Sequence, residues 1–122
     1  MLKKLISNTF TTPSNNTTKN TFKELWKISH LTNYDFLNLY NIPENFDIDC
    51  FYSFMKKNKI TDVALKFSAE ISEEYKTHLE AIVDEIIETE SHEYRPPYIK
   101  FPGLDEEKIT MNYIIFLFIS VL

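Results

Sequence analysis

The residues with the clearest chemical character in this sequence are the carboxylates between Glu73 and Glu93. That stretch holds eight acidic residues against one basic residue, Lys76, and so carries a local charge of −7. At 100° per residue, four of the acids fall on one arc of a helix and two more flank it. The four are Glu73, Glu80, Asp84 and Glu88, and the flanking pair is Glu74 and Glu85.

This row of like charges is a candidate binding surface for a cationic protein. Acidic side chains at i, i+4 repel one another by roughly 0.2–0.5 kcal/mol per pair in an isolated helix. A basic surface that docks on the row relieves this repulsion, and opposite potentials also steer association. We therefore predict that the six carboxylates are partner-binding residues. The alternative is a solvated face that serves only solubility.

Metal chemistry is a second possibility for the same stretch. Glu85, Glu88 and His92 fall on one helical face at i, i+3 and i+7, and His78 lies nearby around the helix. A second helix would have to supply matching ligands, yet the sequence contains no E-x-x-H or H-x-x-x-H pair. Outward carboxylates also lack the burial that raises the pKa of a general acid. We expect no catalytic, cofactor-binding or metal-binding residue, and keep a small metal- or carboxylate-dependent enzyme as an alternative.

A helix must position these carboxylates, and the sequence marks both of its ends. Ser72 can cap the N-terminus, and the two glutamates that follow it suit the positive end of the helix dipole. The proline pair at 96–97 bars continuation. The face opposite the acids is apolar and consists of Tyr75, Leu79, Ile82, Val83, Ile86 and Ile87. We predict an amphipathic helix over residues 72–91.

The remaining sequence predicts further helices. Gly103 is the single glycine, and no Asn-Gly or Asp-Gly pair is present for a tight hairpin turn. Thr21 begins a capping box, and Asp47 can cap a following helix. The predicted helices span residues 22–30, 34–41, 48–57, 62–70, 72–91 and 105–121. We predict a mainly α single domain over 1–122, a bundle of about five or six helices, with residues 7–20 as a flexible polar arm or loop.

Two segments also fit strands, so an α+β fold is the alternative. Within residues 60–71, Val63, Leu65 and Phe67 alternate as in a strand, although Thr61-Asp62 favours a helix start. Residues 113–121 are rich in β-branched and aromatic side chains, which suits a second strand.

The end of the sequence is an uncharged apolar run, residues 109–122. It has 14 residues, whereas a membrane span needs about 20. The acidic residues 105–107 before it favour a helix. We predict a buried element here rather than a membrane anchor.

Composition limits the classes of partner. With one glycine, the sequence lacks the loops that cradle phosphates in common nucleotide sites. The net charge of −5 disfavours nucleic acid and anionic membranes, which bind Lys and Arg. Cys50 is the single cysteine, and the first six residues run into polar sequence rather than an apolar signal segment. We expect a cytoplasmic protein with a basic protein partner.

Two resemblances remain to be weighed. Residues 58–67 followed by 70–79 resemble the helix, turn and recognition-helix layout of helix-turn-helix regulators, which implies DNA binding. The would-be recognition helix begins with Glu73 and Glu74, however, and these would meet phosphates. In composition the chain looks like small acidic bacterial proteins that mask basic nuclease toxins. We predict an inhibitor or immunity (antitoxin-like) protein that neutralises a basic, nuclease-type toxin, with the DNA-binding regulator as an alternative.

Overall fold

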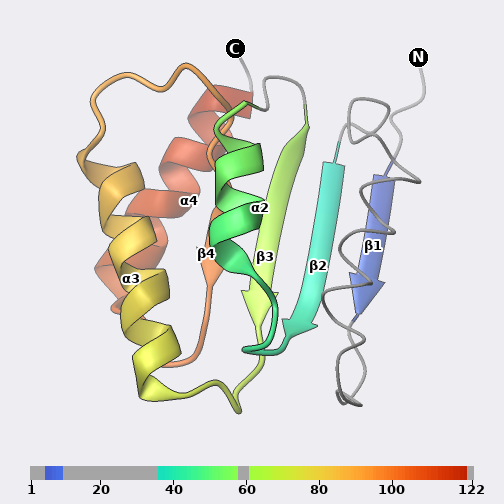
Figure 1. The fold of residues 1–122 in the computed structure, drawn as a ribbon. Coiled ribbons are helices and arrows are strands. Elements are labelled where there is room, and N and C mark those ends of the chain that lie inside the picture. Colours follow the sequence, from blue (N-terminus) through green and yellow to red (C-terminus); the bar gives the residue numbers. More distant parts are fainter. Residues whose placement is uncertain (1–4, 10–35, 58–60, 121–122) are drawn as a thin grey trace.

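The structure is a computed structural model that describes residues 5–9, 36–57 and 61–120. In chain order, its elements are β1 (Leu5–Thr9), β2 (Phe36–Ile42), α2 (Ile48–Met55), β3 (Asp62–Phe67), α3 (Glu73–Glu88), β4 (Tyr98–Lys100) and α4 (Glu106–Ser120). The strands form one parallel sheet in the order β1-β2-β3-β4 (Figure 1). The described residues therefore fold as an α/β unit.

The predicted bundle of five or six helices is wrong, because two of its helices are strands of this sheet. β2 replaces the helix predicted at 34–41, and β3 replaces the helix predicted at 62–70. In β2, Leu37 and Leu39 are buried while the residues between and beside them are half-buried. That alternation is the period of a strand, and pairing with two neighbours fixes it.

The ambiguity of β3 has a physical cause. Its backbone pairs with β2 on one side and β4 on the other, so it is a central strand. Central parallel strands are buried on both faces, and their apolar residues then fit a helical period as well as a strand period. Thr61 is 1% exposed, and Asp62 accepts a hydrogen bond from the Arg95 guanidinium at 2.8 Å. Thr61 and Asp62, which favoured a helix start, therefore lie just before β3 and at its first residue.

The other predicted elements can now be placed. The three helices α2, α3 and α4 correspond to those predicted at 48–57, 72–91 and 105–121. The α+β alternative predicted strands at 60–71 and 113–121; it is correct for residues 62–67 and wrong for 113–120, which lie in α4, and residue 121 lies outside the described residues. The helix predicted at 22–30 lies outside the described residues. Of the predicted arm at 7–20, residues 7–9 belong to β1 and the others lie outside the described residues.

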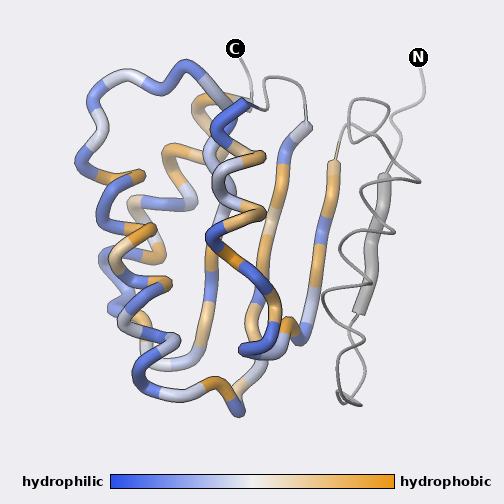
Figure 2. The backbone as a smooth tube through the Cα atoms, viewed as in Figure 1, coloured by the Kyte–Doolittle hydropathy of each residue, from blue (hydrophilic) through white to orange (hydrophobic). Residues whose placement is uncertain are grey.

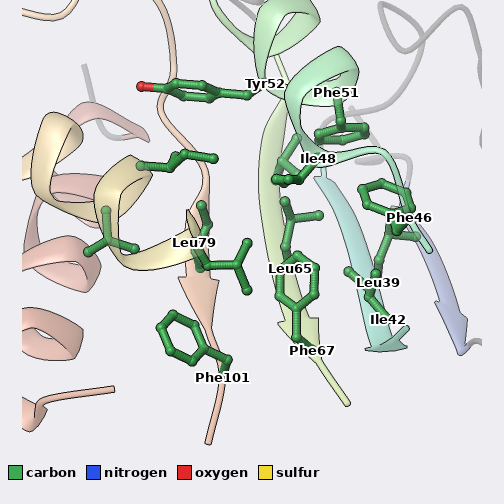
Figure 3. Packing of buried hydrophobic residues seen from close by; sticks show 14 of the residues in the cluster. Leu39, Ile42, Phe46, Ile48, Phe51, Tyr52, Leu65, Phe67, Leu79 and Phe101 are labelled. Atoms are coloured by element: carbon green, nitrogen blue, oxygen red, sulfur yellow. The ribbon is translucent and has the colours of Figure 1, made fainter. Parts of the chain in front are cut away.

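α2 and α3 cover one face of the sheet (Figure 1). Each lies in a connection between neighbouring parallel strands, and right-handed crossovers that step in the same direction place their helices on the same face. Leu39 and Leu65 from the sheet, Phe51 from α2 and Leu79 from α3 belong to one buried cluster, at 0–1% exposure (Figure 3). This cluster orients both helices, so their polar sides face outward.

α4 lies beside α3 and covers the outer edge of β4. The Asn112 side chain is buried there: its Oδ1 accepts a hydrogen bond from the Ile99 N–H at 2.8 Å, and its Nδ2 donates to the Pro97 carbonyl oxygen at 3.1 Å. These bonds replace those that a further strand would make, and so they protect an open sheet edge. α4 has 15 residues, and no helix in the described parts of the chain is long and apolar enough to cross a bilayer.

Candidate functional site

α3 carries the predicted carboxylates on the outside of the molecule. Ser72 caps this helix as predicted, since its hydroxyl oxygen accepts a hydrogen bond from the Tyr75 N–H at 3.2 Å. The buried residues of the inner face are Leu79, Ile82, Val83 and Ile86. Of the six predicted residues, Glu73, Glu74, Glu85 and Glu88 are exposed, and Glu80 and Asp84 are half-buried. The amphipathic geometry of α3 is confirmed, whereas its binding role stays a prediction.

Lys108 of α4 neutralises the middle of the acidic row. Its ammonium group lies 2.7 Å from a Glu80 carboxylate oxygen and 2.8 Å from one of Asp84. Hydrogen bonds to Asp84 and Glu80 raise the pKa of Lys108 above its usual range, so the cation persists at neutral pH. The two central carboxylates therefore join α3 to α4 and are not free charges.

Two more of the predicted carboxylates also have cations beside them. Lys56, which caps the C-terminus of α2, lies 3.0 Å from Glu85. Within α3, Lys76 lies 3.1 Å from Glu73 at i, i+3. Both pairs are largely exposed, and such pairs contribute about 0–1 kcal/mol to stability. Their main effect is to reduce the negative potential in the first turn of α3 and, beside α2, in its last turn.

Part of the negative charge that remains lies where α3 ends. Among the described residues, Glu88, Glu90 and Glu93 have no ion pair, and neither has Glu74 at the opposite end of the helix. Neither α3 nor α4 has a basic residue in its last turn, so the negative ends of the two helix dipoles add to the same potential. Of the six predicted residues, Glu74 and Glu88 thus keep unpaired charges at the two ends of α3, and Glu90 and Glu93 add negative charge beyond its C-terminal end.

The second feature of this region is an exposed apolar face on α4. Figure 2 shows that the last turns of this helix are almost continuously hydrophobic. Its large exposed side chains are Met111 (42%), Tyr113 (45%), Ile114 (57%), Leu117 (44%) and Phe118 (64%). The prediction that residues 109–122 form a buried element is therefore wrong for this side of the helix. Burial is confined to the side that carries Asn112 and Phe116.

A groove of about 480 Å³ joins the two features. It is lined on the α3 side by Ile87, Thr89, Glu90, Ser91 and His92, and on the α4 side by Ile114, Ile115, Phe118 and Ile119. The His92 ring donates a hydrogen bond from Nε2 to the Ile86 carbonyl oxygen at 2.9 Å, because a carbonyl can only accept. This bond holds the turn after α3 and thereby fixes one wall of the groove.

The alternative chemistries receive no geometric support in this region. His92 is bonded to a backbone carbonyl and His78 to Asp49 at 2.7 Å, so neither histidine joins Glu85 and Glu88 in a cluster. Within the ranges that the structure describes, no group of three or more His, Cys, Asp or Glu side chains could hold a metal ion. A helix-turn-helix also lacks its first helix here, because β3 occupies that position.

A second cleft lies at the carboxyl ends of β2 and β3, where α/β sheets often bind ligands. It measures about 310 Å³ and its lining includes Asn41, Glu44 and Glu70. Asn41 adopts φ 55°, a left-handed conformation that asparagine tolerates. Glu44 accepts a hydrogen bond from the Ser72 N–H at 2.8 Å. These contacts explain the local chain path without a ligand.

Comparison of the chain with protein-family models, curated proteins and solved structures found no match. The functional argument therefore rests on the geometry of α3 and α4.

Two components of the candidate site were missed at the level of the sequence: the neutralising Lys108 and the exposed face of α4. Lys108 lies 28 residues from Glu80, so no local spacing could pair them. The apolar residues of α4 occur on all sides of the helix, so the sequence pattern did not distinguish its buried side from its exposed side.

Proposed function

We propose that this protein is a small acidic protein-binding protein whose partner is a basic protein. The specific form of the proposal is an inhibitor or immunity (antitoxin-like) protein that neutralises a basic, nuclease-type toxin in the cytoplasm. The observation that carries it is the unpaired negative charge at the C-terminal end of α3, beside an exposed apolar surface. No catalytic residue, cofactor, nucleic acid or membrane is part of the proposal.

Electrostatics supports a cationic partner over a neutral one. Glu88, Glu90 and Glu93 have no ion pair among the described side chains, and the ends of α3 and α4 add partial negative charge. A basic surface that docks here gains from all of these charges, and its association is steered and salt-sensitive. Glu80 and Asp84 contribute less, because a partner must compete with Lys108 for them. The binding region therefore shifts toward the end of the predicted row.

The experiment begins with affinity capture by the tagged full chain and identification of the recovered basic protein. The affinity of the purified pair is then measured at low and high salt for the wild type and for Glu88→Gln/Glu90→Gln. We expect the double variant to bind at least about tenfold more weakly at low salt, with a smaller salt dependence.

A matched control is Glu70→Gln/Glu106→Gln, which removes the same number of charges at exposed positions away from the end of α3. We expect its binding to change much less. If binding were weakened equally in both double variants, net charge alone, and not the position of the carboxylates, would explain the effect. Salt-independent binding by the wild type would contradict the proposed function. If the recovered partner has nuclease activity and this protein inhibits it, the immunity-protein proposal is supported. If the partner has no such activity, only the general proposal of a basic protein partner remains.

A further inference from the structure

The exposed face of α4 has the pattern of a helix-binding surface. Glu107, Met111, Ile114 and Phe118 follow one another at spacings of three and four residues, so they form a single row along the helix. Ridges of this kind accept the ridges of a second helix between them.

The size of this face also fits a bound helix. The exposed residues Met111, Tyr113, Ile114, Leu117 and Phe118 present on the order of 500 Å² of apolar surface, a large patch for a soluble protein. The groove of about 480 Å³ at its end is lined by Ile87, Ile114 and Phe118 among others. A large apolar side chain from a partner would fill this groove, as an anchor residue does at the centre of an interface.

Acidic groups lie at both ends of the apolar row. Glu107 begins the row in the first turn of α4, and Glu90 lines the groove beside Phe118 at the other end. From Glu107 to Phe118 the helix rises about 16 Å, which corresponds to 11 residues of a partner helix lying along it. Basic residues at that separation would meet both acidic ends while the apolar residues between them cover the row.

The charges also argue against a second copy of this chain as the occupant. In a symmetric antiparallel pair, Glu107 of one copy would approach Glu90 of the other, twice. In a symmetric parallel pair, each acidic end would approach its own counterpart. Both arrangements bring like charges together, which is destabilising across an interface. A helix with basic residues near both of its ends would instead place positive charges beside Glu107 and Glu90.

We propose that the α4 face and its groove bind an amphipathic helix of the partner, with apolar residues at i, i+3, i+4 and i+7 and Lys or Arg about 11 residues apart on either side. This inference rests on the proposed function, because it names the part of the basic partner that docks. It goes further in assigning the main contact to Ile114 and Phe118 rather than to carboxylates.

The test uses the full chain and three synthetic helical peptides of equal length. The probe peptide carries leucines at the stated spacing and two flanking lysines, the second has glutamates in place of these lysines, and the third has the same composition in scrambled order. We expect the probe to bind at least about tenfold more tightly than either control, measured by fluorescence anisotropy. No binding of the probe, or equal binding of the three, would overturn the inference.

The location is tested with Ile114→Gln/Phe118→Gln, which keeps residues suited to a helix at exposed positions. Ser53→Gln, an exposed substitution on α2, is the matched control. The first variant should weaken probe binding at least about tenfold, and the control should leave it unchanged. Undiminished binding in the double variant, or sedimentation that shows a wild-type dimer lost in that variant, would overturn the inference.

The two proposals can fail separately. If the captured partner binds with strong salt dependence that Glu88→Gln/Glu90→Gln reduces, the proposed function stands. If Ile114→Gln/Phe118→Gln then leaves the affinity for that partner unchanged, the helix-binding assignment alone is overturned. If the carboxylate variant changes nothing while the α4 variant abolishes binding, the cationic partner is the part that fails.

Discussion

At the scale of single residues, two polar side chains determine how α4 is attached. Asn112 bonds to the backbone of β4, and Lys108 bonds to two carboxylates of α3. Neither role is visible in the sequence, because both depend on contacts across the fold and neither residue follows a local pattern. A buried asparagine in an apolar helix is nevertheless a signal, since burial of its amide requires partners.

Replacing Asn112 by leucine should destabilise the protein markedly. The Ile99 N–H and the Pro97 carbonyl would lose their bonds in a buried environment, and each unsatisfied group costs about 1–3 kcal/mol. We expect a loss of about 2–5 kcal/mol in the free energy of unfolding, measured by urea denaturation. Thr110→Ala, an exposed change two residues away, should stay within about 0.5 kcal/mol. A stable Asn112→Leu protein would show that the edge contacts contribute little.

Replacing Lys108 by methionine should have opposite effects on stability and on binding. Glu80 and Asp84 lose their cation, so the protein becomes somewhat less stable. The same change exposes two further negative charges, and we expect tighter binding of the basic partner at low salt. Lys57→Met removes the same net charge from an exposed residue after α2 and should change affinity less. Weaker partner binding in Lys108→Met than in the control would contradict an acidic interface.

At the scale of elements, local chemistry predicted the helices and failed for the strands. Asp47 and Ser72 cap α2 and α3 as expected, because capping depends on residues within one turn. β2 and β3 could not be recognised in the same way, since their pairing joins residues far apart in the sequence. The scarcity of glycine excluded tight hairpins but not parallel strands, which are joined by crossovers. The low glycine content therefore argued against an antiparallel sheet with tight hairpins, whereas the protein has a parallel sheet.

The central position of β3 leads to a test of the corrected fold. Leu65 is fully buried under the helices that cover the sheet, so Leu65→Ala leaves a cavity that the neighbouring residues cannot easily fill. We expect a loss of about 2–5 kcal/mol in the free energy of unfolding. Lys100→Ala in the edge strand β4, at an exposed position, should cost far less. Similar losses for the two variants would be inconsistent with β3 at the centre of the sheet.

At the scale of the whole molecule, the sheet separates two different surfaces. The face that α2 and α3 cover holds the buried cluster, while the other face carries half-buried aromatic residues from the strands and is covered in part by α4. There Phe116 of α4 lies against Phe36 and Tyr98, with ring centroids 6.1 Å apart in each pair. The candidate site lies at neither face but along the outer side of α3 and α4. The sequence located the acidic residues of α3 because charge is local, and it missed the exposed apolar side of α4 because exposure depends on the fold.

The packing of tyrosines within this architecture predicts how the protein responds to alkaline pH. Burial raises the pKa of Tyr52, Tyr75 and Tyr94 above the ordinary value. In the unfolded chain tyrosine loses its proton near pH 10, so above that pH the unfolded state binds fewer protons than the folded state. The free energy of unfolding is therefore unaffected by these groups below about pH 10 and falls as the pH rises beyond it.

Tyr75→Phe isolates one of these contributions. The tyrosine hydroxyl donates a hydrogen bond to the Phe46 carbonyl oxygen at 2.8 Å, so its removal should cost about 0.5–1.5 kcal/mol at neutral pH. Above about pH 10 the variant should lose stability less steeply than the wild type, because one titrating group is absent. Urea denaturation across this pH range measures both quantities, and Tyr113→Phe, at a 45% exposed position, is the control. Parallel pH profiles for Tyr75→Phe and the wild type would show that burial of Tyr75 does not limit alkaline stability.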